Sequence, residues 1–126
     1  MKEISLFVGV DLLEIEAVRN TLCRFRERFL NRIFVDEELD FYAHKGEKRF
    51  QEGVAALFAS KEAVKKLFLQ RGETIGWKAI RVLHTSSGKP VVQLSPPFEG
   101  RFSQISLSIS HSRLAVVAVA VAWGEE

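Results

Sequence analysis

The longest helix that the sequence predicts spans residues 47–70, and its periodicity constrains the fold most strongly. At about 100° per residue, one stripe of this helix is apolar and consists of Phe50, Val54, Leu57, Val64 and Phe68. A neighbouring face carries two alanines and two charges, at Ala55, Ala59, Glu62 and Lys66. Alanine side chains are small, so another element or a ligand can approach this face closely. The remaining elements are therefore expected to be organised around this helix.

Three charged residues on this helix need an explanation. Glu62 and Lys66 form an i,i+4 pair, which on an exposed helix contributes only a few tenths of a kcal/mol, about 0.2–0.5, and requires no function. Lys61 falls near the middle of the apolar stripe. A charged side chain there must extend to solvent or find a partner, because an unpaired buried charge is very unfavourable.

The rest of the chain alternates between strand-like and helix-like segments. We expect a strand at residues 4–10 that ends at Asp11, a helix to about residue 30, and a short helix within 34–43. After the long helix, strands are expected at 77–85, 90–94, 104–110 and 114–123, the last one buried on both faces. This order predicts an α+β domain with a mainly antiparallel sheet.

Length, charge and cysteine content limit the class of protein. A chain of 126 residues suits a single domain over 1–126 with a core that holds without disulfides. The net charge of +2 is too small to indicate nucleic-acid binding. Cys23 is the only cysteine, which is typical of a reducing compartment, and no apolar run is long enough to span a membrane. We therefore expect a cytoplasmic protein.

Asp11 has two interpretations. In the first, Asp11 and Glu14 form a helix capping box, because they have the spacing of that motif. The sequence pattern alone favours this first interpretation. Alternatively, Asp11 and Glu62 converge and form a Mg²⁺ site, completed by water and the oxygens of a diphosphate. Lys66 would then contact phosphate and His111 would donate from a corner of the sheet. Any nucleotide would be held without a glycine-rich loop, since the sequence contains neither a Walker motif nor GxGxxG.

Four segments together resemble one family, in the right order and over nearly the whole chain. They are Gly9-Val10-Asp11-Leu12, Phe58-Ala59-Ser60-Lys61-Glu62-Ala63 with Lys66, Gly88-Lys89-Pro90, and Ile109-Ser110-His111-Ser112. The chain is similar to the holo-acyl-carrier-protein synthases, the small trimeric type of 4′-phosphopantetheinyl transferase. The resemblance implies the fold of that family. It also implies transfer of 4′-phosphopantetheine from coenzyme A to a serine of an apo acyl carrier protein, with release of adenosine 3′,5′-bisphosphate, in fatty acid biosynthesis.

The resemblance also implies roles for particular residues. Asp11 and Glu62 would bind Mg²⁺, while Lys66 and His111 would contact the phosphates of coenzyme A. The catalytic residues would be Glu62, Lys66 and His111, with Glu62 or a water held by the metal as alternatives for the general base. Coenzyme A would also meet Gly88, Lys89 and Pro90, and each site would lie between subunits of a homotrimer.

An acidic carrier protein would dock on the basic first helix. Arg28 and Arg32 match the family there, whereas Ala17 stands at a position where a basic residue is expected. Leu57 replaces an arginine or aromatic residue of many relatives, which puts part of the coenzyme A contact in question. Two other classes remain open: a non-catalytic module that docks an acidic carrier through the same helix and, ranked last, a small basic nucleic-acid binder.

Overall fold

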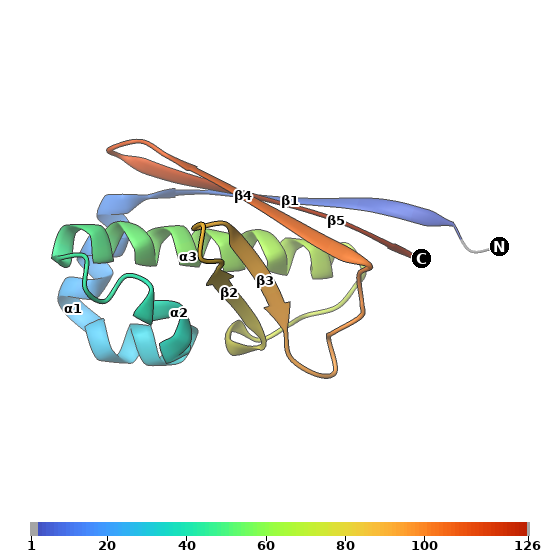
Figure 1. Ribbon diagram of the computed structural model, residues 1–126, viewed down its shortest axis with the longest axis horizontal. Helices are drawn as coiled ribbons and strands as arrows, with labels where there is room; N and C mark the ends of the chain where they lie inside the picture. The colour runs from blue at the N-terminus through green and yellow to red at the C-terminus, as the bar shows by residue number, and fades with distance from the viewer. Residues whose placement is uncertain (1–2, 126) are drawn as a thin grey trace.

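A computed structural model describes residues 3–125, so residues 1–2 and 126 of the predicted domain lie outside the described part. Strands β1 (Ile4–Glu14), β5 (Ala115–Glu125) and β4 (Gln104–His111) form an antiparallel sheet in the order β1-β5-β4. Helix α3 (Glu47–Leu69) lies along one face of this sheet (Figure 1). The predicted α+β class is confirmed.

Strand β1 is longer than predicted and Asp11 lies inside it. The β1–β5 ladder continues from Ile4 to Glu14, where Glu14 pairs with Ala115. Glu14 then precedes the first residue of α1 (Ile15–Ile33), and the side chain of Glu14 makes no capping hydrogen bond. The capping-box interpretation of Asp11 is therefore wrong. A local four-residue pattern was outweighed by continuous pairing with a strand more than a hundred residues away.

The helices follow the predicted order. Helix α1 contains one residue with non-helical backbone angles, Phe25, where φ is −138° and ψ is 32°, so the helix is kinked there. The short helix α2 (Asp36–Asp40) begins with three acidic residues, which suits the positive end of a helix dipole. In the view of Figure 1, α2 and the second half of α1 lie below α3.

The alanine face of α3 packs against the sheet. Ala55, Ala59 and Ala63 are completely buried. The contact is so close that a Cβ atom on Gly9 of β1 would lie 2.0 Å from the carbonyl oxygen of Ala63. Small side chains are thus needed on both elements to let helix and strand meet, and the alanines of this face contact the sheet rather than a ligand.

A separate hairpin stands beside the main sheet. It consists of β2 (Ile80–His84) and β3 (Pro90–Leu94), paired antiparallel. The predicted strand at 77–85 begins three residues late, because residues Trp77–Ala79 form the short 3-10 helix η1.

The outward face of the main sheet is apolar over β1 and β5. Leu6, Val8 and Val10 of β1 are at least half exposed, and on β5 the residues of the same face are only partly covered. The prediction that β5 is buried on both faces is wrong for the single chain, since only the face toward α3 is buried. Within residues 3–125, no helix is long and apolar enough to cross a membrane.

Candidate active site

Asp11, Glu62 and Lys66 meet where β1 crosses α3. Asp11 pairs with Ala118 of β5, whose side chain is buried toward the helix, so the Asp11 side chain points to the same face. The Lys66 ammonium lies 3.5 Å from Asp11 Oδ1. It also donates a hydrogen bond of 2.7 Å to the carbonyl oxygen of Val10. The two carboxylates and the ammonium thus share one place on the molecule.

The electrostatics of this cluster favour a cation. Burial is the main cause that raises the pKa of Glu62, and the charge of Asp11 raises it further, while Lys65 and Lys66 act in the opposite direction. Two carboxylates that repel each other gain from a shared positive charge. Lys66 already provides one such charge, which lies between Asp11 and the Val10 carbonyl.

The donor set suits Mg²⁺ better than a transition metal. No group of three or more His, Cys, Asp or Glu side chains that could hold a metal occurs among residues 3–125. Two carboxylates are few for zinc, but Mg²⁺ commonly takes one or two protein carboxylates and completes its shell with water and phosphate oxygens. Asp11 and Glu62 would be the protein ligands.

Sequence reasoning missed the backbone and amide groups that hold this cluster. Gln70, one turn beyond Lys66, donates to the Val8 carbonyl at 2.7 Å and to the Lys66 carbonyl at 3.1 Å. The i,i+4 spacing of Lys66 and Gln70 is the signal that could have indicated a shared face toward β1.

Lys61 has a buried partner. Its ammonium lies 2.7 Å from Glu38 Oε1, and both side chains are fully inaccessible to solvent. Every other polar atom of the pair is also satisfied, and the remaining partners are the backbone carbonyls of Ile33 and Trp77 and the backbone amides of Val35 and Val82. Burial is the main cause that lowers the pKa of Lys61, and Glu38 opposes it. Lys61 therefore belongs to the core and does not face the cluster around Glu62.

His111 lies in a different place, at the end of β4. It lines a groove of about 400 Å³ together with Tyr42, Lys45, Arg49, Glu52, Gly53 and Ala56. Two cations, Lys45 and Arg49, thus accompany the histidine, a combination suited to an anion. Neither cation was predicted as a site residue, although their spacing of four residues could have suggested a common face.

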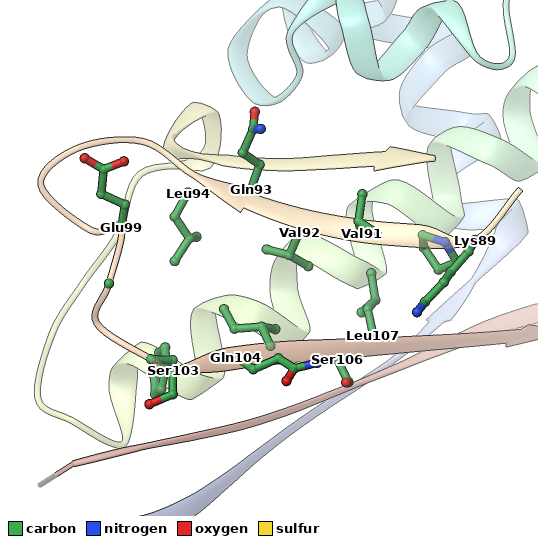
Figure 2. A pocket seen from close by; sticks show the side chains of 14 residues that line it. Lys89, Val91, Val92, Gln93, Leu94, Glu99, Ser103, Gln104, Ser106 and Leu107 are labelled. Atoms are coloured by element: carbon green, nitrogen blue, oxygen red, sulfur yellow. The ribbon is translucent and has the colours of Figure 1, made fainter. Parts of the chain in front are cut away.

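Gly88 and Lys89 belong to the turn between β2 and β3, and Pro90 is the first residue of β3. Gly88 has a positive φ of 87°, and the amide of Gly88 donates to the Thr85 carbonyl at 2.8 Å. Lys89 and Pro90 also line a cleft of about 610 Å³ between β3 and β4. Figure 2 shows this cleft, with Lys89 at one end and Glu99 at the other.

The predicted site residues therefore form two groups within one chain. Asp11 lies on β1, at one edge of the main sheet, whereas His111 lies on β4, at the other edge, with β5 between them. Along α3, Glu62 lies six residues beyond Ala56, the nearest helix residue of the His111 groove, which corresponds to about 9 Å. A single chain does not bring the two groups together.

The proposed carrier-binding arginines lie on an exposed basic surface. Arg28 and Arg32 are both exposed. At the kink, the exposed ring of Phe25 is flanked by Arg24 and Arg28, whose guanidinium carbons lie 5.5 Å and 6.0 Å from the ring centroid. An exposed apolar ring with two cations close to it is a suitable surface for an acidic protein.

Comparison with known proteins assigns the chain to a class. The family model of the 4′-phosphopantetheinyl transferase superfamily matches residues 7–122. The chain belongs to this superfamily. It is 36% identical to a holo-[acyl-carrier-protein] synthase of Chloroherpeton thalassium, over 90% of this chain and 94% of that protein. It is 40% identical to one of Chlamydia felis, over 91% of this chain and 94% of that protein.

Solved structures agree with this assignment. A holo-(acyl-carrier-protein) synthase of Bacillus anthracis in complex with CoA (3′,5′-ADP) superposes with a TM-score of 0.79 at 27% identity, and 97% of this chain and 99% of that chain are covered. The Helicobacter pylori enzyme in complex with coenzyme A gives a TM-score of 0.78 at 27% identity over 91% and 98%. The family resemblance expected from the sequence motifs is confirmed.

Proposed function

We propose that this protein transfers the 4′-phosphopantetheine group of coenzyme A to a serine of an apo acyl carrier protein, in fatty acid biosynthesis and in the cytoplasm. The observation that carries the proposal is the cluster of Asp11, Glu62 and Lys66, where β1 crosses α3. Its chemistry suits a metal-bound diphosphate, and relatives of this size bind coenzyme A.

The reaction is a displacement at phosphorus. The serine oxygen forms a bond to the β-phosphorus of coenzyme A, and the bond from that phosphorus to the bridging diphosphate oxygen breaks. Adenosine 3′,5′-bisphosphate leaves, and the serine proton passes to water or to Glu62. Positioning and charge neutralisation account for most of the catalysis in such transfers.

Lys66 would neutralise part of the charge that gathers on the leaving diphosphate. In the free protein its ammonium donates to the Val10 carbonyl, and its side chain is 45% exposed, so it can turn from that carbonyl toward a phosphate. Mg²⁺, held by Asp11 and Glu62, would supply further neutralisation of the same oxygens. Burial and the charge of Asp11 raise the pKa of Glu62, and a bound cation would favour its charged form.

We further propose that each site is shared between subunits of a homotrimer. His111 and the turn at Gly88, Lys89 and Pro90 would contact coenzyme A bound to Asp11 and Glu62 of a neighbouring subunit. Two observations support this. The groups lie apart within one chain, and the apolar outward face over β1 and β5 is a surface that a second copy would cover.

The carrier protein would dock on the exposed basic surface around Arg28 and Arg32, where Phe25 offers an apolar contact at the kink of α1. This surface also suits the alternative of a non-catalytic module that binds an acidic carrier. The cluster of Asp11, Glu62 and Lys66 favours the enzyme, since docking alone needs no such site.

Mass spectrometry of a panel of apo carrier proteins tests the reaction. With MgCl₂ and coenzyme A, the protein is expected to add about 340 Da to a carrier. Glu62→Gln is expected to reduce the rate about 1000-fold with an unchanged melting temperature, because it removes a charge at nearly constant shape. A wild-type protein that modifies no carrier, in parallel with an active transferase, contradicts the proposal.

The same assay at increasing NaCl concentration tests the docking of the carrier on Arg28 and Arg32. A KM for the carrier that does not change with salt would exclude these arginines as the docking surface.

Mixing two inactive variants tests the shared site. Glu62→Gln and His111→Ala are each expected to be inactive, but a mixture left to exchange subunits should regain part of the wild-type rate, because some sites then combine an intact Glu62 with an intact His111. Equal mixtures of Glu62→Gln and Asp11→Asn serve as the control. They should stay inactive, because Asp11 and Glu62 of each site come from the same chain and one of them is always replaced. A mixture of Glu62→Gln and His111→Ala without activity, although the subunits exchange, would place both groups in one chain.

A further inference from the structure

The buried pair of Glu38 and Lys61 takes no part in the reaction described above, yet each charged atom of the pair has a bonding partner. Its five polar contacts tie α3 to the end of α1, the start of α2, η1 and β2. Lys61 alone reaches the last residue of α1, Ile33, at 2.7 Å and the first residue of η1, Trp77, at 3.1 Å.

Close contacts hold α3 on both sides of one residue, Glu62. Lys61 immediately precedes Glu62, and Ala63 immediately follows it. On the side of Ala63, the helix backbone touches Gly9 so closely that no Cβ atom fits. On the side of Lys61, three acceptors hold the ammonium. Glu62 therefore lies between two fixed contacts, and successive side chains of a helix point about 100° apart.

We propose that Glu38 and Lys61 are a positioning pair for the carboxylate of Glu62. The pair sets the rotation and the axial placement of α3, so that Glu62 faces Asp11 across the helix–strand contact. This inference rests on the proposed function, in which Glu62 is a metal ligand.

The choice of an ion pair over apolar side chains supports a positioning role. Replacing a buried ion pair by well-packed apolar residues is often neutral or favourable for stability, so stability alone does not explain the pair. Hydrogen bonds to backbone carbonyls have a narrow range of favourable distances and angles. An apolar contact has no such directional preference and would tolerate a small rotation of α3. The ion pair thus specifies where Glu62 points.

The double variant Glu38→Leu/Lys61→Met tests this, because it replaces the pair by apolar side chains of similar size. We expect cooperative unfolding to be retained. Calorimetric titration of MgCl₂ in the presence of coenzyme A should give a Kd raised about tenfold, the low end of the effect of groups that orient metal ligands. The Mg²⁺ concentration for half-maximal transfer should rise by the same factor, while kcat at saturating Mg²⁺ stays close to that of the wild type.

Val64→Ala is the matched control. Val64 is completely buried on α3, so its truncation destabilises the core while both charges of the pair and their hydrogen-bond partners are kept. Its Kd for Mg²⁺ should match the wild type. A folded double variant with an unchanged Kd, or an equal rise in Val64→Ala, overturns the positioning role.

If the double variant does not fold, Glu38→Asp decides by the same titration. It keeps both charges and shortens the carboxylate arm by one carbon, so an unchanged Kd overturns the proposal and a raised Kd supports it. Failure of the proposed function gives a different result. In that case the wild-type protein itself shows no Mg²⁺-dependent binding of coenzyme A.

Discussion

Two lysine–carboxylate pairs on α3 show how the same chemistry serves different purposes in different surroundings. Lys61 and Glu38 lie 2.7 Å apart with no exposed side-chain surface. Lys66 and Asp11 lie 3.5 Å apart, and their side chains are 45% and 18% exposed. The first pair is surrounded by backbone partners, whereas the second is open to solvent.

The difference between the pairs indicates where charge is available for chemistry. All polar atoms of the Lys61–Glu38 pair are bonded within the protein, so neither residue can contact a substrate without breaking the core. Lys66 makes one short hydrogen bond, to Val10, which a phosphate could replace. Five residues along one helix therefore separate a lysine that is structural from one suited to catalysis.

Breaking the buried pair should have the largest effect on stability. Lys61→Met leaves Glu38 as an uncompensated buried charge, which is expected to lower the free energy of unfolding by about 3–5 kcal/mol. Lys66→Met is the matched variant and should change it by less than about 1 kcal/mol, as for an exposed pair. Urea unfolding followed by circular dichroism measures both. Similar losses of unfolding free energy in the two variants would show that the difference in burial does not change how much each pair contributes to stability.

The exposed pair of Lys66 and Asp11 should contribute little to stability. A double-mutant cycle of Lys66→Met and Asp11→Asn is expected to give a coupling below about 1 kcal/mol in low salt. The coupling should decrease in 1 M NaCl, where the Debye length is about 3 Å. The cycle is measured by urea unfolding at both salt concentrations. A larger coupling that salt does not reduce would indicate that Lys66 and Asp11 are a structural pair as well.

Features that depend on residues close in sequence, such as the bounds and the buried face of α3, were predicted well. The angles along α3 placed Lys61 in the apolar stripe, and the residue is indeed completely buried. The bounds of α3 differ from those expected by a single residue at the end. Helical periodicity and local stop signals depend on neighbours in sequence, and these are available from the sequence alone.

Features that depend on distant segments were not predicted. The identity of Glu38 as the partner of Lys61 depends on how α2 packs against α3, and the sequence gives no local signal of it. Asp11 was favoured as a helix cap because the competing ladder to β5 is non-local. The apolar residues of β5 predicted two buried faces, yet one face is only partly covered in the chain, since composition does not show which molecule covers a surface.

The contact between Gly9 and Ala63 sets the distance between β1 and α3. A Cβ atom on Gly9 would lie 2.0 Å from the carbonyl oxygen of Ala63, so no methyl group fits between the two backbones. Glu62 is next to Ala63 and Asp11 is two residues from Gly9, so the gap between the two carboxylates is mechanically coupled to this one contact. Any side chain at position 9 would force β1 and α3 apart and would change the distance between the carboxylates of Asp11 and Glu62.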